Sequence, residues 1–234
     1  MPVLGLSAAA VLDSRQAKPE SIGMRFFIAA RSRTAQDAAD AAFAAGRQVV
    51  VLGAGLDTFG LRHPGHDVFE VDHPATQQWK IARLREAGLE APSVRFVGVD
   101  FEVDDLASRL AEAGHSAAEP SCYLWLGVVP YLTEAAFRQT LAVTARAAGD
   151  EVVFDYAEPL DGHGIGRTRR AARAAAVGEP WRFFATPEHI AGIASSAGFD
   201  AVQDLDGAAL AGRLLGWVTS RSGGGHVVHA SRRR

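Results

Sequence analysis

The sequence has few cysteines, no long hydrophobic run and little net charge, and each shortage excludes a class of protein. Its single cysteine, Cys122, excludes an intrachain disulfide and every multi-cysteine metal site, which is typical of a reducing compartment. The mildly apolar residues 3–12 are too few to span a membrane, and no basic residue precedes them as in a signal peptide. The formal net charge of −3 gives no electrostatic attraction to nucleic acid or to an anionic membrane. We therefore expect a cytoplasmic protein that binds neither.

Length and composition are those of a globular α/β domain. The chain has 234 residues, of which 48% are hydrophobic and 22% are charged. Residues 1–46 are mostly helical by composition, so we expect an N-terminal helical cap there. The remaining residues, 47–234, are expected to form one domain with an insertion at about 157–198. No spacing of histidine, cysteine and acidic residues indicates a metal site.

The stretch at residues 48–72 carries the strongest functional signal. It begins with an apolar, β-branched run at residues 49–52, which is typical of a buried parallel strand. Gly53 and Gly55 follow, and glycines are needed where a ligand approaches the backbone closely. A short helix and a second strand that ends in Asp72 come next. This order predicts the cofactor half-site of a Rossmann-like sheet.

The pattern leaves three interpretations open. A dinucleotide-binding fingerprint has a third glycine, and this chain has Thr58 at that position. An NAD-dependent oxidoreductase is therefore one alternative. The two glycines and Asp72 also suit a nucleoside cofactor without a pyrophosphate, such as S-adenosylmethionine, because an acidic side chain at a strand end accepts hydrogen bonds from ribose hydroxyls. An ordinary tight turn between strand and helix is the third interpretation.

Strands alternate with helices along the rest of the chain, which predicts a mostly parallel sheet covered by helices. The further predicted strands occupy residues 93–101, 121–129, 151–156, 199–204 and 226–230. The predicted helices occupy residues 24–45, 56–62, 73–87, 104–113, 167–176 and 186–198, and another begins at Thr133. Residues 205–225 are too irregular to be assigned.

Four stretches resemble motifs of one known family. The first is residues 47–58, RQVVVLGAGLDT, and the others are residues 69–74, 131–133 and 179–188. They are similar to motifs of the leucine carboxyl methyltransferase family, whose bacterial members include polyketide carboxyl O-methyltransferases. The resemblance covers roughly residues 24–215. It implies a Rossmann-like class I methyltransferase fold, with a mostly parallel seven-stranded sheet, helices on both faces, and S-adenosyl-L-methionine as the cofactor.

The resemblance also implies roles for residues at the strand ends. Gly53, in the turn that it forms with Gly55, would lie against the methionine part of the cofactor. Asp72 would accept the ribose hydroxyls. Asp100 and Phe101 match the pair that flanks the adenine, in which the acid accepts a hydrogen bond from the exocyclic amine. These positions define the expected cofactor site.

Two further cofactor positions differ in how well they match the family. Arg31 matches an arginine that pairs with the cofactor carboxylate. Leu126 stands where the family often has a glutamate, so one polar contact to the methionine end is absent or replaced. The N-terminal segment is also shorter than in typical members, whose extra helices cover the cofactor and shape the acceptor pocket. A non-catalytic cofactor-binding protein is therefore a further alternative.

The expected reaction is O-methylation of a small-molecule carboxylate or hydroxyl, with secondary metabolism as one setting. A carboxylate is ionised at neutral pH and needs no general base, whereas a phenol, with a pKa of about 10, benefits from one. Tyr131, after the fourth strand, is the candidate catalytic residue. His163 and His189 are further candidates near the acceptor, and all three also have a structural interpretation. A homodimer is left open.

Overall fold

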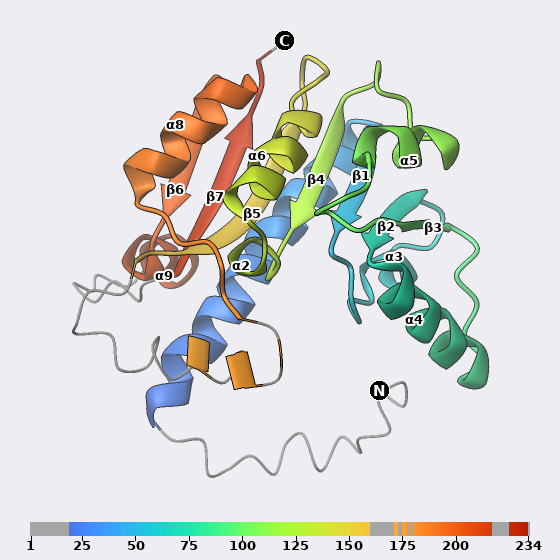
Figure 1. Ribbon diagram of the computed structural model, residues 1–234, viewed down its shortest axis with the longest axis horizontal. Helices are drawn as coiled ribbons and strands as arrows, with labels where there is room; N and C mark the ends of the chain where they lie inside the picture. Colours follow the sequence, from blue (N-terminus) through green and yellow to red (C-terminus); the bar gives the residue numbers. More distant parts are fainter. Residues whose placement is uncertain are drawn as a thin grey trace.

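The computed structural model describes residues 19–159, 171–172, 175–176, 178, 180–216 and 225–233. In this part of the chain, seven strands form one sheet in the order β3-β2-β1-β4-β5-β7-β6 (Figure 1). The strands are β1 (Gln48–Leu52), β2 (Val68–Asp72), β3 (Val94–Gly98), β4 (Ser121–Trp125), β5 (Glu151–Ala157), β6 (Ala201–Leu205) and β7 (Gly225–Ser231). β7 runs antiparallel to β5 and β6, and the other neighbouring strands are parallel. The mostly parallel seven-stranded sheet is confirmed.

Helices cover both faces of this sheet, which is why its central strands are apolar on both sides. The buried residues of α5 (Leu106–Glu112), α6 (Glu134–Val143) and α8 (Pro187–Ala197) share one core cluster with alternate strand residues. Those of α2 (Pro19–Ala44), α3 (Phe59–Arg62) and α9 (Gly207–Leu215) form a second cluster on the opposite face. Figure 1 shows α6 in front of the strands and α2 behind them. None of the described helices is long and apolar enough to cross a membrane.

The order of the strands reverses between β1 and β4. From β1 the chain continues outward through β2 and β3, whereas β4 pairs with the other side of β1 and leads to β5. The two connections leave in opposite directions, so a crevice opens outside the carboxyl ends of β1 and β4. The residues that follow these strands in the sequence therefore meet in space.

The predicted fourth strand, residues 121–129, is too long. β4 ends at Trp125, and Val129–Tyr131 forms a 3-10 helix, η2. The reason is Gly127, whose φ of +74° turns the backbone out of the extended conformation. The predicted third strand is likewise shorter, because β3 ends at Gly98.

Two helices also differ from the prediction. The helix expected at residues 56–62 begins only at Phe59, and the side chain of Thr58 makes no capping hydrogen bond. The unassigned residues 205–225 contain α9, which begins after Asp206, whose side chain accepts a hydrogen bond from the backbone N–H of Ala209. The sequence GAALAGRLL of α9 contains two glycines, which hid its helical pattern.

Candidate active site

The turn after β1 depends on glycine at both of its predicted positions. Gly53 and Gly55 have left-handed φ angles of +67° and +46°, which other residues rarely adopt. A Cβ on Gly53 would lie 2.2 Å from Cγ2 of Val128, so the backbone of the turn approaches the loop after β4 too closely for a side chain. The turn therefore presents bare backbone at the carboxyl ends of the central strands.

Asp72, at the end of β2, is hydrogen-bonded to this turn. Its Oδ2 accepts a hydrogen bond from the backbone N–H of Gly55, and its Oδ1 accepts one from the N–H of His73 at 2.7 Å. A carboxylate offers about four lone pairs, so two acceptor positions are left over for other donors. Asp72 is only partly buried, and those positions remain reachable.

Asp100 and Phe101 follow β3 and lie next to this acid. The backbone N–H of Val99 donates to the carbonyl of Asp72 at 2.8 Å, which places Asp100 beside the end of β2. Oδ1 of Asp100 accepts from the N–H of Glu102 at 3.0 Å, and its side chain is 39% exposed. The ring of Phe101 packs against Trp125, with 6.2 Å between centroids. The predicted adenine-side residues thus meet at the same edge as the glycine turn.

Arg31 reaches this edge from α2, on the second face of the sheet. Its Nη1 donates to Oδ2 of Asp155 at 2.6 Å, and its side chain is 21% exposed. The guanidinium also lies against Gly127, where an added Cβ would come within 3.2 Å of Nη2. Nε of Arg31 is buried and has no hydrogen-bond partner. A cation with an unused donor is therefore held in place beside the glycine turn.

A cavity of about 250 Å³ lies beside Arg31 and the first glycine of the turn, and Asp72, Asp100 and Phe101 are not among the residues that line it. Arg31, Gly53, Asp57, Leu124 and Leu126 are among the residues that line it. Leu126 contributes only apolar surface, so the polar contact expected from the family's glutamate is absent at this position. A larger cavity, about 430 Å³, lies at the amino ends of β1–β3 and is far from the predicted site residues.

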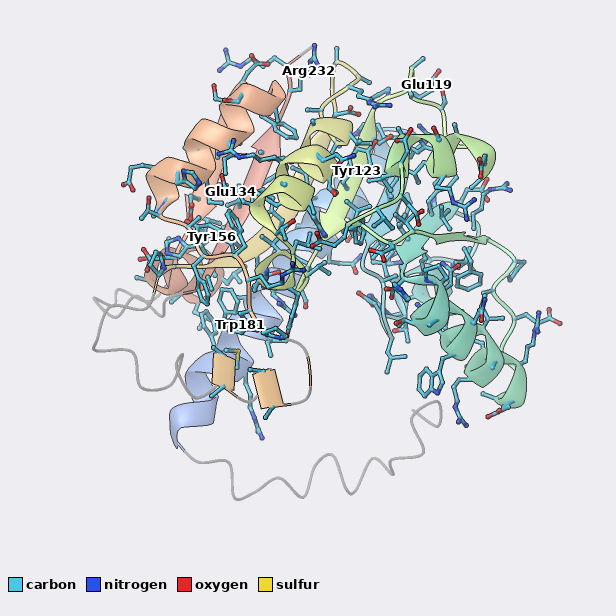
Figure 2. The ribbon with its side chains drawn as sticks, viewed as in Figure 1. Glu119, Tyr123, Glu134, Tyr156, Trp181 and Arg232 are labelled. Carbon is cyan, nitrogen blue, oxygen red and sulfur yellow. The ribbon has the colours of Figure 1, made fainter. Side chains whose placement is uncertain are left out.

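Tyr131, the candidate catalytic residue, ends η2 at the same edge. Its ring packs edge-on against Trp181, with 6.5 Å between centroids. The segment that carries Trp181 is fixed there, because the backbone N–H groups of Arg182 and Phe183 both donate to the carbonyl of Pro130, at 2.6 and 3.2 Å. Trp181 lies below the strands in Figure 2, and its indole Nε1 is buried without an acceptor.

Of the two histidine candidates, the structure describes only His189, which is engaged by another helix. Nε2 of His189 lies 3.2 Å from Oε1 of Glu134, so the imidazole bridges α8 and α6. His163 lies outside the described residues. Among the residues that the structure describes, no group of three or more histidine, cysteine or acidic side chains could hold a metal ion.

Sequence reasoning missed Asp155, which holds Arg31. An acid near the end of a strand was the signal used for Asp72 and Asp100, and the predicted strand at 151–156 contains Asp155 in the same kind of position. The signal was therefore present in the sequence, and only the partner on α2 was unpredictable.

The sheet order, the glycine turn and the acids at the strand ends are those of the Rossmann-like class I methyltransferase fold. The sequence profile of the leucine carboxyl methyltransferase family matches residues 5–145. The chain belongs to this family. The match includes Arg31, the glycine turn, Asp72, Asp100 and Tyr131.

Curated relatives agree with this assignment. One from Bacillus subtilis (strain 168), "Putative S-adenosyl-L-methionine-dependent methyltransferase YktD", is 37% identical over 163 residues, 65% of this chain and 53% of that protein. A relative from Streptomyces coelicolor with the same description is 38% identical over 135 residues, 56% of this chain and 47% of that protein. The chain therefore spans about half the length of these relatives.

Solved structures show the same fold at low identity. The apo methyltransferase SibL has a TM-score of 0.53 and 18% identity, covering 80% of this chain and 51% of that one. Magnesium protoporphyrin IX methyltransferase from Synechocystis, solved with S-adenosylhomocysteine, has a TM-score of 0.52 and 13% identity, covering 87% of this chain and 84% of that one. At these identities the likeness concerns the fold alone.

Proposed function

We propose that this chain is an S-adenosyl-L-methionine-dependent methyltransferase that methylates a carboxylate oxygen of a small molecule. The observation that carries the proposal is Arg31, which lines the cavity at the glycine turn and whose Nε is buried without a hydrogen-bond partner. A buried, charged donor without an acceptor is unfavourable unless a ligand supplies one. The carboxylate of the cofactor's methionine part is such a ligand.

The other residues at this edge suit the remaining parts of the cofactor. The bare backbone of Gly53 and Gly55 leaves room for the methionine part, and Asp72 has acceptor positions left for the ribose hydroxyls. Asp100 and Phe101 are placed to flank the adenine, with Asp100 accepting from its exocyclic amine. Leu126 offers an apolar wall next to Arg31. The relatives' names support the same cofactor.

When bound, the cofactor would supply an electrophilic methyl group on a sulfonium, which would pass to the acceptor oxygen as the carbon–sulfur bond breaks and its electron pair stays on sulfur. The protein mainly has to align the two groups and exclude water. Tyr131 and Trp181 form an aromatic wall at this edge and are the proposed acceptor contacts, with the buried indole N–H of Trp181 available as a donor to an acceptor oxygen.

A carboxylate acceptor agrees with the two proposed acceptor contacts, Tyr131 and Trp181, because neither carries a carboxylate or an imidazole. His189 is engaged by Glu134, and His163 lies outside the described residues. An ionised carboxylate needs no proton removed before it reacts, whereas a hydroxyl does. The family's name also refers to a carboxyl group. A small molecule as the acceptor, and a homodimer, remain predictions.

The test is a labelled-methyl assay with a panel of aromatic carboxylic acids and matched phenols, run from about pH 6 to 9. We expect transfer to a carboxylic acid at a rate that is nearly flat over this range, because the acceptor is ionised throughout. A rate that rises steeply with pH on the best acceptor would overturn the carboxylate assignment. Binding of S-adenosylhomocysteine without transfer to any acceptor would favour a non-catalytic protein, and binding of NAD instead would favour an oxidoreductase.

A further inference from the structure

A buried ion pair lies beneath the glycine turn. Nζ of Lys80, on α4 (Pro74–Glu86), is 2.6 Å from Oε2 of Glu70 on β2, and their side chains are only 6% and 1% exposed. The same Nζ donates to the backbone carbonyl of Asp57 at 2.5 Å. Asp57 ends the glycine turn and lines the cavity of the candidate cofactor site. One buried ammonium therefore joins α4, β2 and the turn.

Fold stability alone does not explain this pair. Lysine and glutamate are rarely buried so completely, because removing two charges from water offsets much of their attraction. Apolar residues of similar volume often stabilise such a position equally well. An apolar side chain at position 80 could not donate a hydrogen bond to the carbonyl of Asp57, and this contact is what the lysine adds.

The hydrogen bond from Lys80 reaches the half of the glycine turn that β2 does not hold. The first half of the turn is held by β2, because Ala54 donates to the carbonyl of Val71 at 3.0 Å and Gly55 donates to Asp72. Residues 56–57 are exposed to solvent. The two glycines before them also give the turn more backbone conformational entropy to lose on ordering than other residues would. Lys80 holds the second half from below.

Glu70 keeps the ammonium in place. Its backbone carbonyl accepts a hydrogen bond from Nε2 of Gln77 at 3.0 Å, which fixes α4 over β2. Gly60 lets α3 approach β2 closely, because a Cβ at this position would lie 3.0 Å from Oε1 of Glu70. Burial raises the pKa of Glu70, and Lys80 opposes that rise. Each of the two buried charges is therefore stabilised by the other.

We infer that Lys80 is a positioning residue for the cofactor: oriented by Glu70, it holds the carbonyl of Asp57 and keeps the glycine turn in its binding conformation before the cofactor arrives. A turn that is already ordered loses less entropy on binding, so affinity rises without a direct contact to the ligand. The inference rests on the cofactor site of the proposed function and adds the group that pre-forms it.

The test separates positioning from folding with a double variant. Lys80→Met alone leaves Glu70 buried without its partner, so we expect a lower melting temperature. The Glu70→Leu/Lys80→Met double variant removes both charges and is expected to melt close to the wild type. It still lacks the donor to Asp57, so calorimetry should show S-adenosylhomocysteine binding about tenfold more weakly, and KM for the cofactor should rise more than kcat falls. Arg83→Met, an exposed position on the same helix, is the control and should change neither quantity.

The outcomes distinguish this inference from the proposed function. A double variant that melts and binds like the wild type overturns the role of Lys80. A wild type that does not bind S-adenosylhomocysteine at all overturns the cofactor site instead. If the double variant does not fold, hydrogen exchange of the wild type decides. The amides of Ala54, Gly55 and Asp57, which donate to Val71, Asp72 and Ala54, should be protected before the ligand is added, and protection that appears only on binding contradicts the inference.

Discussion

Arg31 and Asp155 are 124 positions apart in the sequence, and their side chains form an ion pair with 2.6 Å between Nη1 and Oδ2. The second carboxylate oxygen of Asp155 accepts a hydrogen bond from the backbone N–H of Gly127. One carboxylate therefore aligns α2, the end of β5 and the loop after β4 around the candidate cofactor cavity. Arg31 is held in this position by the protein and does not need a ligand to place it.

The first prediction tests whether Arg31 binds the cofactor carboxylate. Arg31→Met should weaken binding of S-adenosylhomocysteine by about tenfold or more, because a hydrogen bond to a charged group contributes roughly 1.5–3 kcal/mol. Calorimetry with 5′-methylthioadenosine, which lacks that carboxylate, should give the same affinity for variant and wild type. Arg33→Met, which removes an exposed pair with Asp37, is the control. Equal losses for both ligands would mean that Arg31 only shapes the cavity through Asp155.

The second prediction concerns Asp72, which holds the turn and is proposed to bind the ribose. Asp72→Asn should lower the affinity for S-adenosylhomocysteine by about tenfold, since charge-assisted hydrogen bonds are lost. It should also lower the melting temperature without ligand by about 2–4 °C, as expected for about 1 kcal/mol in a chain of this size. Asp67→Asn, before the start of β2 and 62% exposed, is the matched control. Unchanged affinity with a lower melting temperature would leave Asp72 with a structural role only.

The third prediction separates two reasons for glycine at position 53. Gly53→Ala and Gly88→Ala introduce the same left-handed strain, because their φ angles are +67° and +63°. Only the Cβ at position 53 meets a neighbour, 2.2 Å from Cγ2 of Val128, whereas the one at position 88 meets nothing within 4 Å. Urea unfolding should show that Gly53→Ala loses roughly 1–3 kcal/mol more than Gly88→Ala, as overpacking does. Adding Val128→Ala should restore part of the difference, and equal losses would show that Val128 moves aside freely.

The fourth prediction is a pH dependence of stability at the far end of the sheet. His226 on β7 is buried, with Nδ1 2.6 Å from Asp204 on β6 and Nε2 3.5 Å from Glu158. Burial lowers the pKa of His226, but the hydrogen bond and charge of Asp204 and the charge of Glu158 outweigh it, so the pKa is raised. The stacked ring of Tyr156, whose hydroxyl donates to Asp204, also faces this group.

A raised histidine pKa stabilises the folded state below the unfolded value, about 6.5, and this stabilisation is lost as the pH rises through the folded value. The free energy of unfolding should therefore decrease as the pH rises above about 6.5 in the wild type and decrease less in His226→Gln. Chemical unfolding at several pH values measures this difference. His189→Gln, an exposed histidine on α8, serves as the comparison. Parallel profiles for the wild type and His226→Gln would contradict the assignment.

The site was predictable from the sequence where its signals are local. The apolar run before Gly53, the glycine turn and the acid at Asp72 all lie within one strand–helix–strand unit, so their spacing alone places them together. The acid at Asp100 was found by the same rule. The conformation of the turn itself was less predictable, because Ala54 and Gly55 donate hydrogen bonds to residues of β2 that lie 17 positions further along the chain.

The sequence by itself determined the alternation of strands and helices and the identity of the strand-end residues, because side-chain periodicity and backbone preferences act over a few residues. Only the tertiary structure decided that Arg31 faces Asp155 and that Lys80 reaches the carbonyl of Asp57. These contacts join segments whose meeting depends on strand order and helix packing. No local pattern encodes which buried charge finds which partner, because any donor brought within hydrogen-bonding distance in a low-dielectric interior would satisfy the same chemistry.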